Sequence, residues 1–270
     1  MEGLYLYCIR DKTTDNTMFS MKGIDGEGEI LTLSYRELEA VVSKVSLEEF
    51  DSEAIQIKAQ NDLNWIKEKA VIHERVIEEA MRKDDKILGV IPMSFGIIFK
   101  KEAKLIETLD KNYEKIQQAL DNIRGKQQWG LKVYLKDKKI LEQRIKAVNG
   151  IIKEREKEIA SLPEGMAFFM EEDLREIINR EMNKELNDMM DVLFETFKKH
   201  AVDSIRNKNL EKELTGRSEP MVLNAAYLIL DEKIEGFKKE AKRLKQEFQA
   251  KGFYLEYNGP WPAYDFAKLL

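Results

Sequence analysis

Hydrophobic and polar residues near the start of the chain follow a pattern typical of β-strands. Residues 4–9 and 30–34 are rich in aromatic and branched side chains, which suit buried strands, and the glycines between these runs predict a loop or hairpin. Ser34 and Glu37 have the spacing of a capping box. They predict a short helix that continues to about Ser43.

Helical spacing follows in the next part of the chain. Between Leu63 and Ala80 the hydrophobic positions recur in steps of three and four, which predicts one face of a helix. Residues 87–92 predict a strand at a sheet edge or strand end, because they finish with a proline. Residues 105–123 predict a second helix, and we place a domain boundary directly after it.

The second half of the chain begins with a strand at residues 129–135 and continues as long helices. The helical stretches cover about 138–161 and 171–206 and predict an antiparallel pair, since a Leu-Pro-Glu-Gly turn separates them. A strand, a helix and a final strand are then predicted at residues 221–230, 234–248 and 253–257. Gly252 stands where a C-cap glycine would end the helix.

This order of elements predicts an α+β protein with two domains. Residues 1–125 form an N-terminal α+β domain. Residues 126–270 form a C-terminal ferredoxin-like α+β domain, which carries the long helical pair and an aromatic tail. A length of 270 residues agrees with two domains of roughly 100–200 residues each.

Composition narrows the classes of partner. The chain has 45 basic and 50 acidic side chains, a net charge of −5, and 35% charged residues with interspersed signs. This balance argues against nucleic acid and against an anionic lipid membrane as the main partner. No hydrophobic run approaches the ~18–20 residues of a transmembrane helix. One cysteine, Cys8, and the absence of an N-terminal signal predict a protein of the reducing cytoplasm.

Residues suited to catalysis are few. His73 and Glu74 open like the metalloprotease pattern HExxH, but Ile77 stands where the second histidine is required. Ser94 lies in a loose match to a nucleophile elbow, with Pro92 in place of the first glycine. We therefore predict no catalytic residue, no metal site and no cofactor. The residues favour a binding or assembly protein, and a serine hydrolase that uses Ser94 is the enzymatic alternative.

The segment near the C-terminus is the least ordinary in the chain. Residues 258–266 read NGPWPAYDF, in which two prolines stiffen the backbone around a tryptophan. The segment closely resembles the terminal G-P-W-P-x-Y-x-F signature of the GvpL/GvpF family of gas vesicle proteins. Further blocks resemble the family in the same order, so that the resemblance covers nearly the whole chain: residues 5–7, 38–43, 73–77, 91–99, 129–133 and 223–229.

The resemblance implies an accessory, non-enzymatic function in building gas vesicles. It also implies a two-domain α+β fold, no cofactor and a cytoplasmic location on gas vesicles. Members of the family are thought to bind the small hydrophobic shell subunit and other accessory proteins during nucleation or early growth, and to be minor shell-associated components. Ser94 stands where the family commonly has a basic residue, and Gln128 where it has an acidic one. A pair between those two charges is absent here.

The hydrophobic stripe of the second long helix is a candidate partner-binding surface. It includes Met182, Met189 and Met190, whose flexible thioethers adapt to varied apolar partners. The alternative is that these methionines fill the core.

The aromatic side chains of the tail form a second candidate. Trp261, Tyr264 and Phe266 either anchor an interface or form a structural latch that closes the two domains. Two other functions remain open: a scaffold that binds only other accessory proteins, and an RNA-binding ferredoxin-like module.

Overall fold

The computed structural model describes residues 1–14, 19–83 and 86–267, and it divides into two compact units. Unit 1 comprises Met1–Gln128 together with Gly259–Leu270, and unit 2 comprises Trp129–Asn258. The division after Gln128 lies close to the boundary predicted after residue 125. The tail differs from the prediction, because it belongs to unit 1 and not to the second domain. The chain thus leaves unit 1, builds unit 2 and returns to unit 1.

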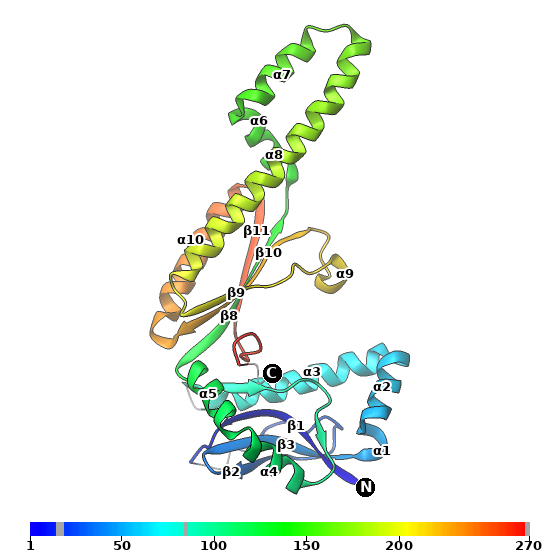
Figure 1. Ribbon diagram of the computed structural model, residues 1–270, viewed down its shortest axis with the longest axis vertical. Coiled ribbons are helices and arrows are strands. Elements are labelled where there is room, and N and C mark those ends of the chain that lie inside the picture. The colour runs from blue at the N-terminus through cyan, green and yellow to red at the C-terminus, as the bar shows by residue number, and fades with distance from the viewer. Residues whose placement is uncertain (15–18, 84–85, 268–270) are drawn as a thin grey trace. The chain divides into compact units, whose positions relative to one another are not determined.

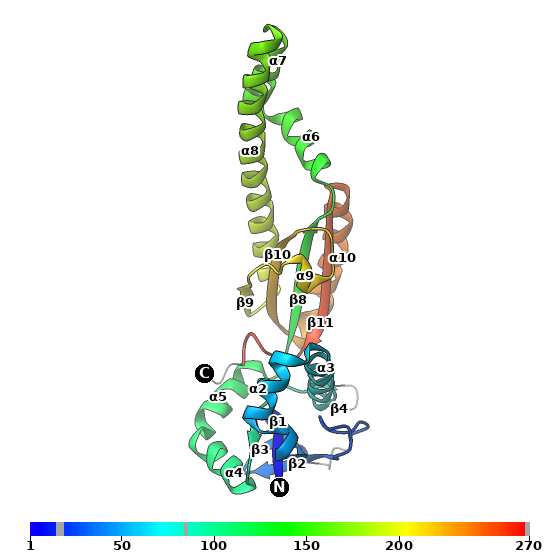
Figure 2. The same cartoon turned by 90° about the vertical axis from the view of Figure 1, so that its right-hand side faces the viewer.

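Unit 1 is built on an antiparallel sheet with a buried central strand. The strands are β1 (Glu2–Asp11), β2 (Ile30–Tyr35), β3 (Leu38–Ser46), β6 (Val90–Pro92) and β7 (Ile98–Phe99). Their order is β2-β3-β1-β6, and β7 also pairs with β1. Residues 5–9 of β1 are all buried, because helices cover both faces of the sheet (Figures 1 and 2).

The prediction of a helix after Ser34 is wrong. Residues 30–46 form the β2–β3 hairpin, in which Tyr35 pairs with Leu38. Arg36 makes the tight turn with a positive φ of 51°. The branched residues Val41 and Val42 are buried in β3, which favours a strand over a helix at these positions.

The helices of unit 1 are α1 (Leu47–Phe50), α2 (Ser52–Asn61), α3 (Leu63–Ala80), α4 (Glu102–Lys111) and α5 (Tyr113–Ile123). The prediction of α3 is confirmed. The sequence pattern did not reveal α1 and α2, and the predicted helix at 105–123 is divided at Asn112. The predicted strand at 87–92 is likewise divided, into β5 (Lys86–Ile87), which pairs with β4 (Arg82–Lys83), and β6.

The sheet of unit 2 has the strand order of a ferredoxin-like fold. Its strands are β8 (Lys126–Leu135), β9 (Asp203–Arg206), β10 (Met221–Leu230) and β11 (Phe253–Trp261), in the order β11-β8-β10-β9. The connections run β8–helices–β9–β10–α10–β11, with α10 at Ile234–Ala250. Short helices, α9 (Lys212–Thr215) and η1 (Asp231–Lys233), lie in the connections. The predicted α+β class is confirmed. The three predicted strands correspond to β8, β10 and β11, whereas β9 lies in a segment predicted to be helical.

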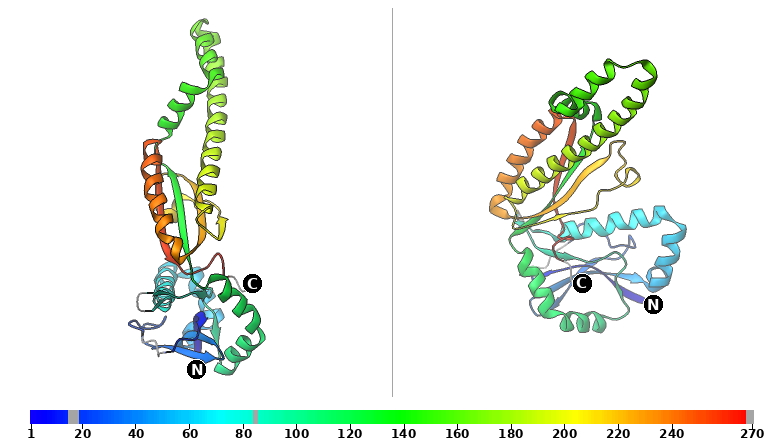
Figure 3. Two further views of the ribbon diagram at one scale, coloured as in Figure 1. Left: turned by 90° about the vertical axis from the view of Figure 1, so that its left-hand side faces the viewer. Right: turned by 45° about the horizontal axis from the view of Figure 1, so that its top comes forward.

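A helical excursion connects β8 to β9. It consists of α6 (Lys138–Val148), α7 (Gly150–Ala160) and α8 (Glu164–Lys198), and α7 packs antiparallel to the first half of α8 (Figure 1). The 35 residues of α8 span roughly 52 Å. The helix predicted at 171–206 begins earlier, at Glu164, and ends earlier, at Lys198. Residues 203–206 form β9 instead. We call the hairpin of α7 and the first half of α8 the helical arm; Figures 2 and 3 show it beyond the sheet of unit 2.

Candidate partner-binding surfaces

The helical arm exposes large apolar side chains near its free end. Met166, Phe168 and Phe169, which we call the tip cluster, expose 59%, 62% and 71% of their surface. The two phenyl rings lie edge to face with their centroids 5.9 Å apart. Large apolar side chains gathered on a surface mark sites of protein interaction. Periodicity in the sequence did not predict this cluster, because adjacent phenylalanines do not belong to one helical stripe.

The predicted methionine stripe lies mostly inside unit 2. Met182 and Met190 are 4% and 0% exposed and belong to the hydrophobic core. Met189 is half-buried and packs against the same core. The structure thus favours the alternative that the stripe fills the core, since helix α8 turns this face toward α6, α7 and the sheet.

Met189 also lines a groove between α8 and α10. The α8–α10 groove has a volume of about 370 Å³. Its floor consists of the buried Leu193, Leu244 and Phe248, and Val192, 67% exposed, forms part of its wall. The groove is therefore an apolar surface open to solvent on unit 2.

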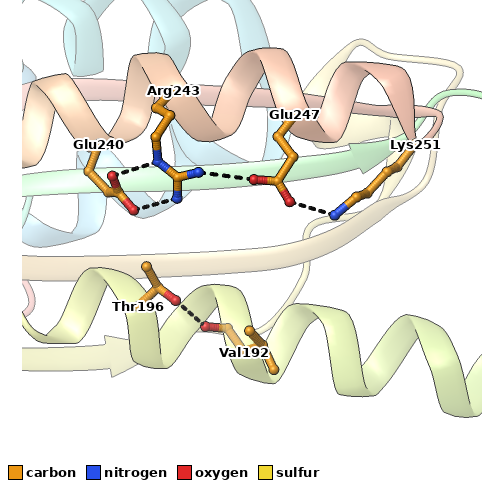
Figure 4. A network of polar contacts seen from close by, with 6 residues as sticks. All are labelled: Val192, Thr196, Glu240, Arg243, Glu247 and Lys251. Atoms are coloured by element: carbon orange, nitrogen blue, oxygen red, sulfur yellow. Dashed lines mark hydrogen bonds and ion pairs between the residues drawn. The ribbon is translucent and has the colours of Figure 1, made fainter.

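Charged side chains of α10 form a ladder along one edge of this groove, as Figure 4 shows. Arg243 donates to Glu240 and Glu247, and Lys251 donates to the other oxygen of Glu247 at 2.6 Å. These hydrogen bonds lower the pKa of Glu240 and of Glu247 below their ordinary values. The two positive and two negative charges of this α10 ladder balance each other.

The aromatic tail is held within unit 1 by side-chain hydrogen bonds. The Tyr264 hydroxyl donates to Glu74 Oε2 at 2.7 Å, and Asn122 Nδ2 donates to the Phe266 carbonyl oxygen at 3.2 Å. Burial raises the pKa of Glu74, and burial together with the Glu74 carboxylate raises that of Tyr264. Phe266 is buried, and Trp261 is half-buried. These contacts explain why the tail belongs to unit 1.

Gln128 takes part in the same anchoring. Its Nε2 donates to Asp265 Oδ2 at 2.7 Å, and its Oε1 accepts from the Asp265 backbone N–H at 3.1 Å. A carboxylate at this position would face the Asp265 carboxylate. The glutamine amide therefore suits the acidic side chain of Asp265. Ser94 is exposed in the loop after β6.

His73 does not act as a general base for the candidate nucleophile Ser94, because both of its ring nitrogens form hydrogen bonds to other groups. Nε2–H donates to the Met93 carbonyl oxygen at 3.1 Å, so Nδ1 accepts from the Tyr5 hydroxyl at 3.0 Å. The Gly96 N–H in turn donates to Tyr5. Burial lowers the pKa of His73 to about 4, which keeps the imidazole neutral at pH 7. His73 is a structural residue of the unit 1 interior.

A buried ion pair completes the polar interior of unit 1. Arg10 donates to Glu39 Oε2 from Nε at 3.1 Å and from Nη2 at 3.0 Å, and its Nη1 donates to the Ala80 carbonyl oxygen at 2.7 Å. The other oxygen of Glu39 accepts from the Thr13 backbone N–H. The pair connects β1, β3 and the end of α3 and has no opening to a ligand, which makes it structural.

Two other kinds of site are absent from the described ranges. Histidine, cysteine and acidic side chains do not gather there in threes or larger groups suited to a metal ion. Among the described helices, none combines the length and hydrophobicity of a membrane-spanning segment. Among the described residues, the tip cluster and the α8–α10 groove expose apolar side chains to solvent, whereas the tail is held within unit 1.

Comparisons with known proteins agree with the resemblance seen in the sequence. The chain is 20% identical over 269 residues to gas vesicle protein F1 of Halobacterium salinarum, covering 99% of this chain and 94% of the relative. It is 23% identical to gas vesicle protein L of a Streptomyces species, covering 91% and 85%. The crystal structure of GvpF from Anabaena sp. PCC7120 superposes with a TM-score of 0.76 at 18% identity, over 99% of both chains. This likeness shows a shared fold.

The family assignment follows from a match along almost the full length. The model of the family described as gas vesicle synthesis protein GvpL/GvpF matches residues 3–268. The match includes both units and the aromatic tail. The chain therefore belongs to the GvpL/GvpF family of gas vesicle synthesis proteins.

Proposed function

We propose that this protein binds the hydrophobic shell subunit and other accessory proteins during nucleation and assembly of gas vesicles. It acts in the cytoplasm, remains associated with the vesicle as a minor component, and needs neither nucleic acid, lipid membrane nor cofactor. Membership of a gas vesicle family supports a function in gas vesicle synthesis. The observation that carries the binding function is the tip cluster on the helical arm.

The tip cluster has the properties of a capture site for an apolar protein surface. Two phenylalanines and a methionine remain largely exposed although the hydrophobic effect favours their burial by about 1.5–3 kcal/mol each. They lie in the first two turns of α8 and are not among the described side chains that pack against the core of unit 2. Binding a partner would bury them.

A shell subunit with a gas-facing apolar side is a suitable partner. Such a subunit must stay soluble until it joins the growing wall, and reversible capture by a small apolar site achieves this. The site must also release the subunit, so a few side chains are better suited than an extensive interface. The size of the tip cluster meets this condition.

The experiment is co-expression of the tagged full-length protein with the shell subunit, followed by measurement of soluble shell subunit in the purified complex. We expect Phe168→Ser combined with Phe169→Ser to reduce the captured subunit at least about tenfold, a loss of about 1.4 kcal/mol or more. Both positions are exposed, so the variant should keep its melting temperature.

Leu214→Ser is the matched control. Leu214 is 74% exposed on unit 2, in α9, outside the arm. It should leave capture unchanged. Equal capture by the wild type and the Phe168/Phe169 variant would contradict a role for the tip cluster. No capture by the folded wild type would favour a scaffold that binds only other accessory proteins.

A further inference from the structure

The α8–α10 groove is a second apolar surface, distinct from the tip cluster. Val192 of the groove and Phe168 of the tip lie on the same helix, roughly 36 Å apart along its axis. The groove and the tip cluster are therefore separate surfaces, more than about six helical turns apart on α8.

Most polar side chains around the groove already have partners and its floor is apolar, so the interior offers few groups to a polar ligand. The Thr196 hydroxyl donates to the Val192 carbonyl oxygen at 2.7 Å, which turns the threonine methyl group toward α10 (Figure 4). Glu185 forms an ion pair with Arg144 at 3.0 Å. The charges of the α10 ladder are balanced among themselves. The occupant must therefore present an apolar face.

The walls of the groove favour a helix as occupant. Both walls are α-helices, whose backbone groups are engaged in their own hydrogen bonds. An extended peptide would find no backbone partners there, whereas a helix satisfies its own N–H and C=O groups. The lining of α8 runs from Glu185 to Thr196, roughly 16 Å, which corresponds to about three helical turns.

One charge at the edge of the groove lacks an ion pair. Within the described residues, no cationic group lies within 4 Å of the Asp188 carboxylate, and Asp188 is exposed at the α8 edge. Because the α10 edge is balanced, the excess charge of the groove edge is negative. A cationic side chain on the occupant would complement it.

We propose that the α8–α10 groove binds an amphipathic helix of another protein, with an apolar stripe in the groove and a lysine or arginine beside Asp188. A second copy of this chain fits poorly. The most exposed aromatic side chains of its described residues are those of the tip cluster, which is followed directly by Glu171, Glu172 and Asp173. Those carboxylates would meet Asp188 with the same charge.

The test uses synthetic peptides and the full-length protein. Two fluorescein-labelled, stapled helices of about 15 residues carry the same leucine stripe, flanked by lysines in one and by glutamates in the other. A third peptide is the lysine version with a central proline in place of the staple. Fluorescence anisotropy at low ionic strength measures each affinity. We expect the lysine helix to bind at least about tenfold more tightly than the glutamate helix, and the proline peptide to bind at least about tenfold more weakly than the lysine helix.

Two variants with matched controls locate the site. Asp188→Lys should abolish or reverse the charge preference, while Asp173→Lys, on the same helix, should not. Met189→Gln combined with Val192→Asn should weaken the lysine helix about tenfold. Val71→Asn, at an exposed helical valine of unit 1, should have no effect.

Several results would overturn the proposal. The first two are equal affinity of the lysine and glutamate helices, and no binding of either helix. The third is binding of the proline peptide as tightly as the lysine helix. The fourth is unchanged affinity of the Met189/Val192 variant for the lysine helix. None of these results bears on capture of the shell subunit, which is measured at the tip cluster. The two proposals can therefore fail separately.

Discussion

The two units are stabilised by interiors of different chemistry. Among the described residues, the buried polar and charged side chains all lie in unit 1: Arg10, Glu39, Ser43, Lys69, His73 and Gln128. The core of unit 2 is hydrophobic, and it extends from the sheet along α8 into the helical arm.

This difference separates a rigid part from an adaptable part. Buried hydrogen-bond networks require one geometry, since each unpaired group costs free energy. A hydrophobic core tolerates repacking with smaller losses. Unit 1 is thus a defined scaffold, and unit 2 carries the apolar surfaces, the tip cluster and the α8–α10 groove. Three sets of variants probe this contrast.

The largest effect is expected for the buried ion pair of unit 1. Glu39→Ala leaves the fully buried Arg10 guanidinium without its counter-charge. We expect the free energy of unfolding of unit 1 to fall by about 3–5 kcal/mol. Hydrogen exchange resolved by residue should show the loss in unit 1 and not in unit 2.

Glu29→Ala is the control for this prediction. Glu29 forms an exposed ion pair with Lys22 at 3.9 Å in the same unit. Its replacement should cost at most about 1 kcal/mol. If Glu39→Ala were as mild as Glu29→Ala, the polar interior would not be what holds unit 1 together.

The next effect concerns pH. The folded-state pKa of His73 is about 4, below the ordinary value of 6.5, so the unfolded chain binds a proton more readily. The stability due to neutral His73 is complete above pH 6.5 and is lost as pH falls toward 4. The loss amounts to about 3 kcal/mol.

Urea unfolding between pH 7 and pH 4 measures this contribution. His73→Gln should flatten the pH dependence of unit 1, because the replaced side chain does not titrate. The control is His200→Gln, at the half-buried histidine of unit 2. This variant should show the same pH dependence of unit 1 stability as the wild type. Parallel curves for wild type and His73→Gln would show that protonation of His73 is not coupled to unfolding.

The smallest effect is expected at the tail. Gln128→Glu places a carboxylate against Asp265 and removes the hydrogen bond that Gln128 Nε2 donates. We expect a loss of about 1–3 kcal/mol, together with faster proteolysis of the tail.

Adding Asp265→Asn to Gln128→Glu should restore most of the stability, because the asparagine amide can donate to the new carboxylate. Thermal unfolding and limited proteolysis of the single and double variants measure this. A double variant no more stable than the single one would place the anchoring of the tail in other contacts.

Periodicity correctly predicted the elements that bury a single face or one continuous hydrophobic run. Helices α3 and α10 and strand β10 appear in the structure where the pattern placed them, because each buries one face or one continuous run. The β2–β3 hairpin was missed, since the turn depends on Arg36 adopting a positive φ, which its residue type does not indicate.

The candidate surfaces were harder to predict. A hydrophobic stripe such as that of Met182 and Met190 indicates burial but not whether the chain itself provides the covering surface. Predicting the groove would require the distance between α8 and α10, and these helices are far apart in the sequence. The Phe168–Phe169 pair was the available signal, because neither residue belongs to the hydrophobic stripe predicted for this helix.

The return of the tail to unit 1 has a consequence for synthesis of the protein. A nascent chain usually folds its first domain while later ones are still being made. Here residues 259–267 join unit 1 only after the ribosome has produced all of unit 2. Unit 1 therefore stays incomplete on the ribosome, with the partners of Tyr264 and Asp265 exposed to water, until translation of the inserted unit is finished.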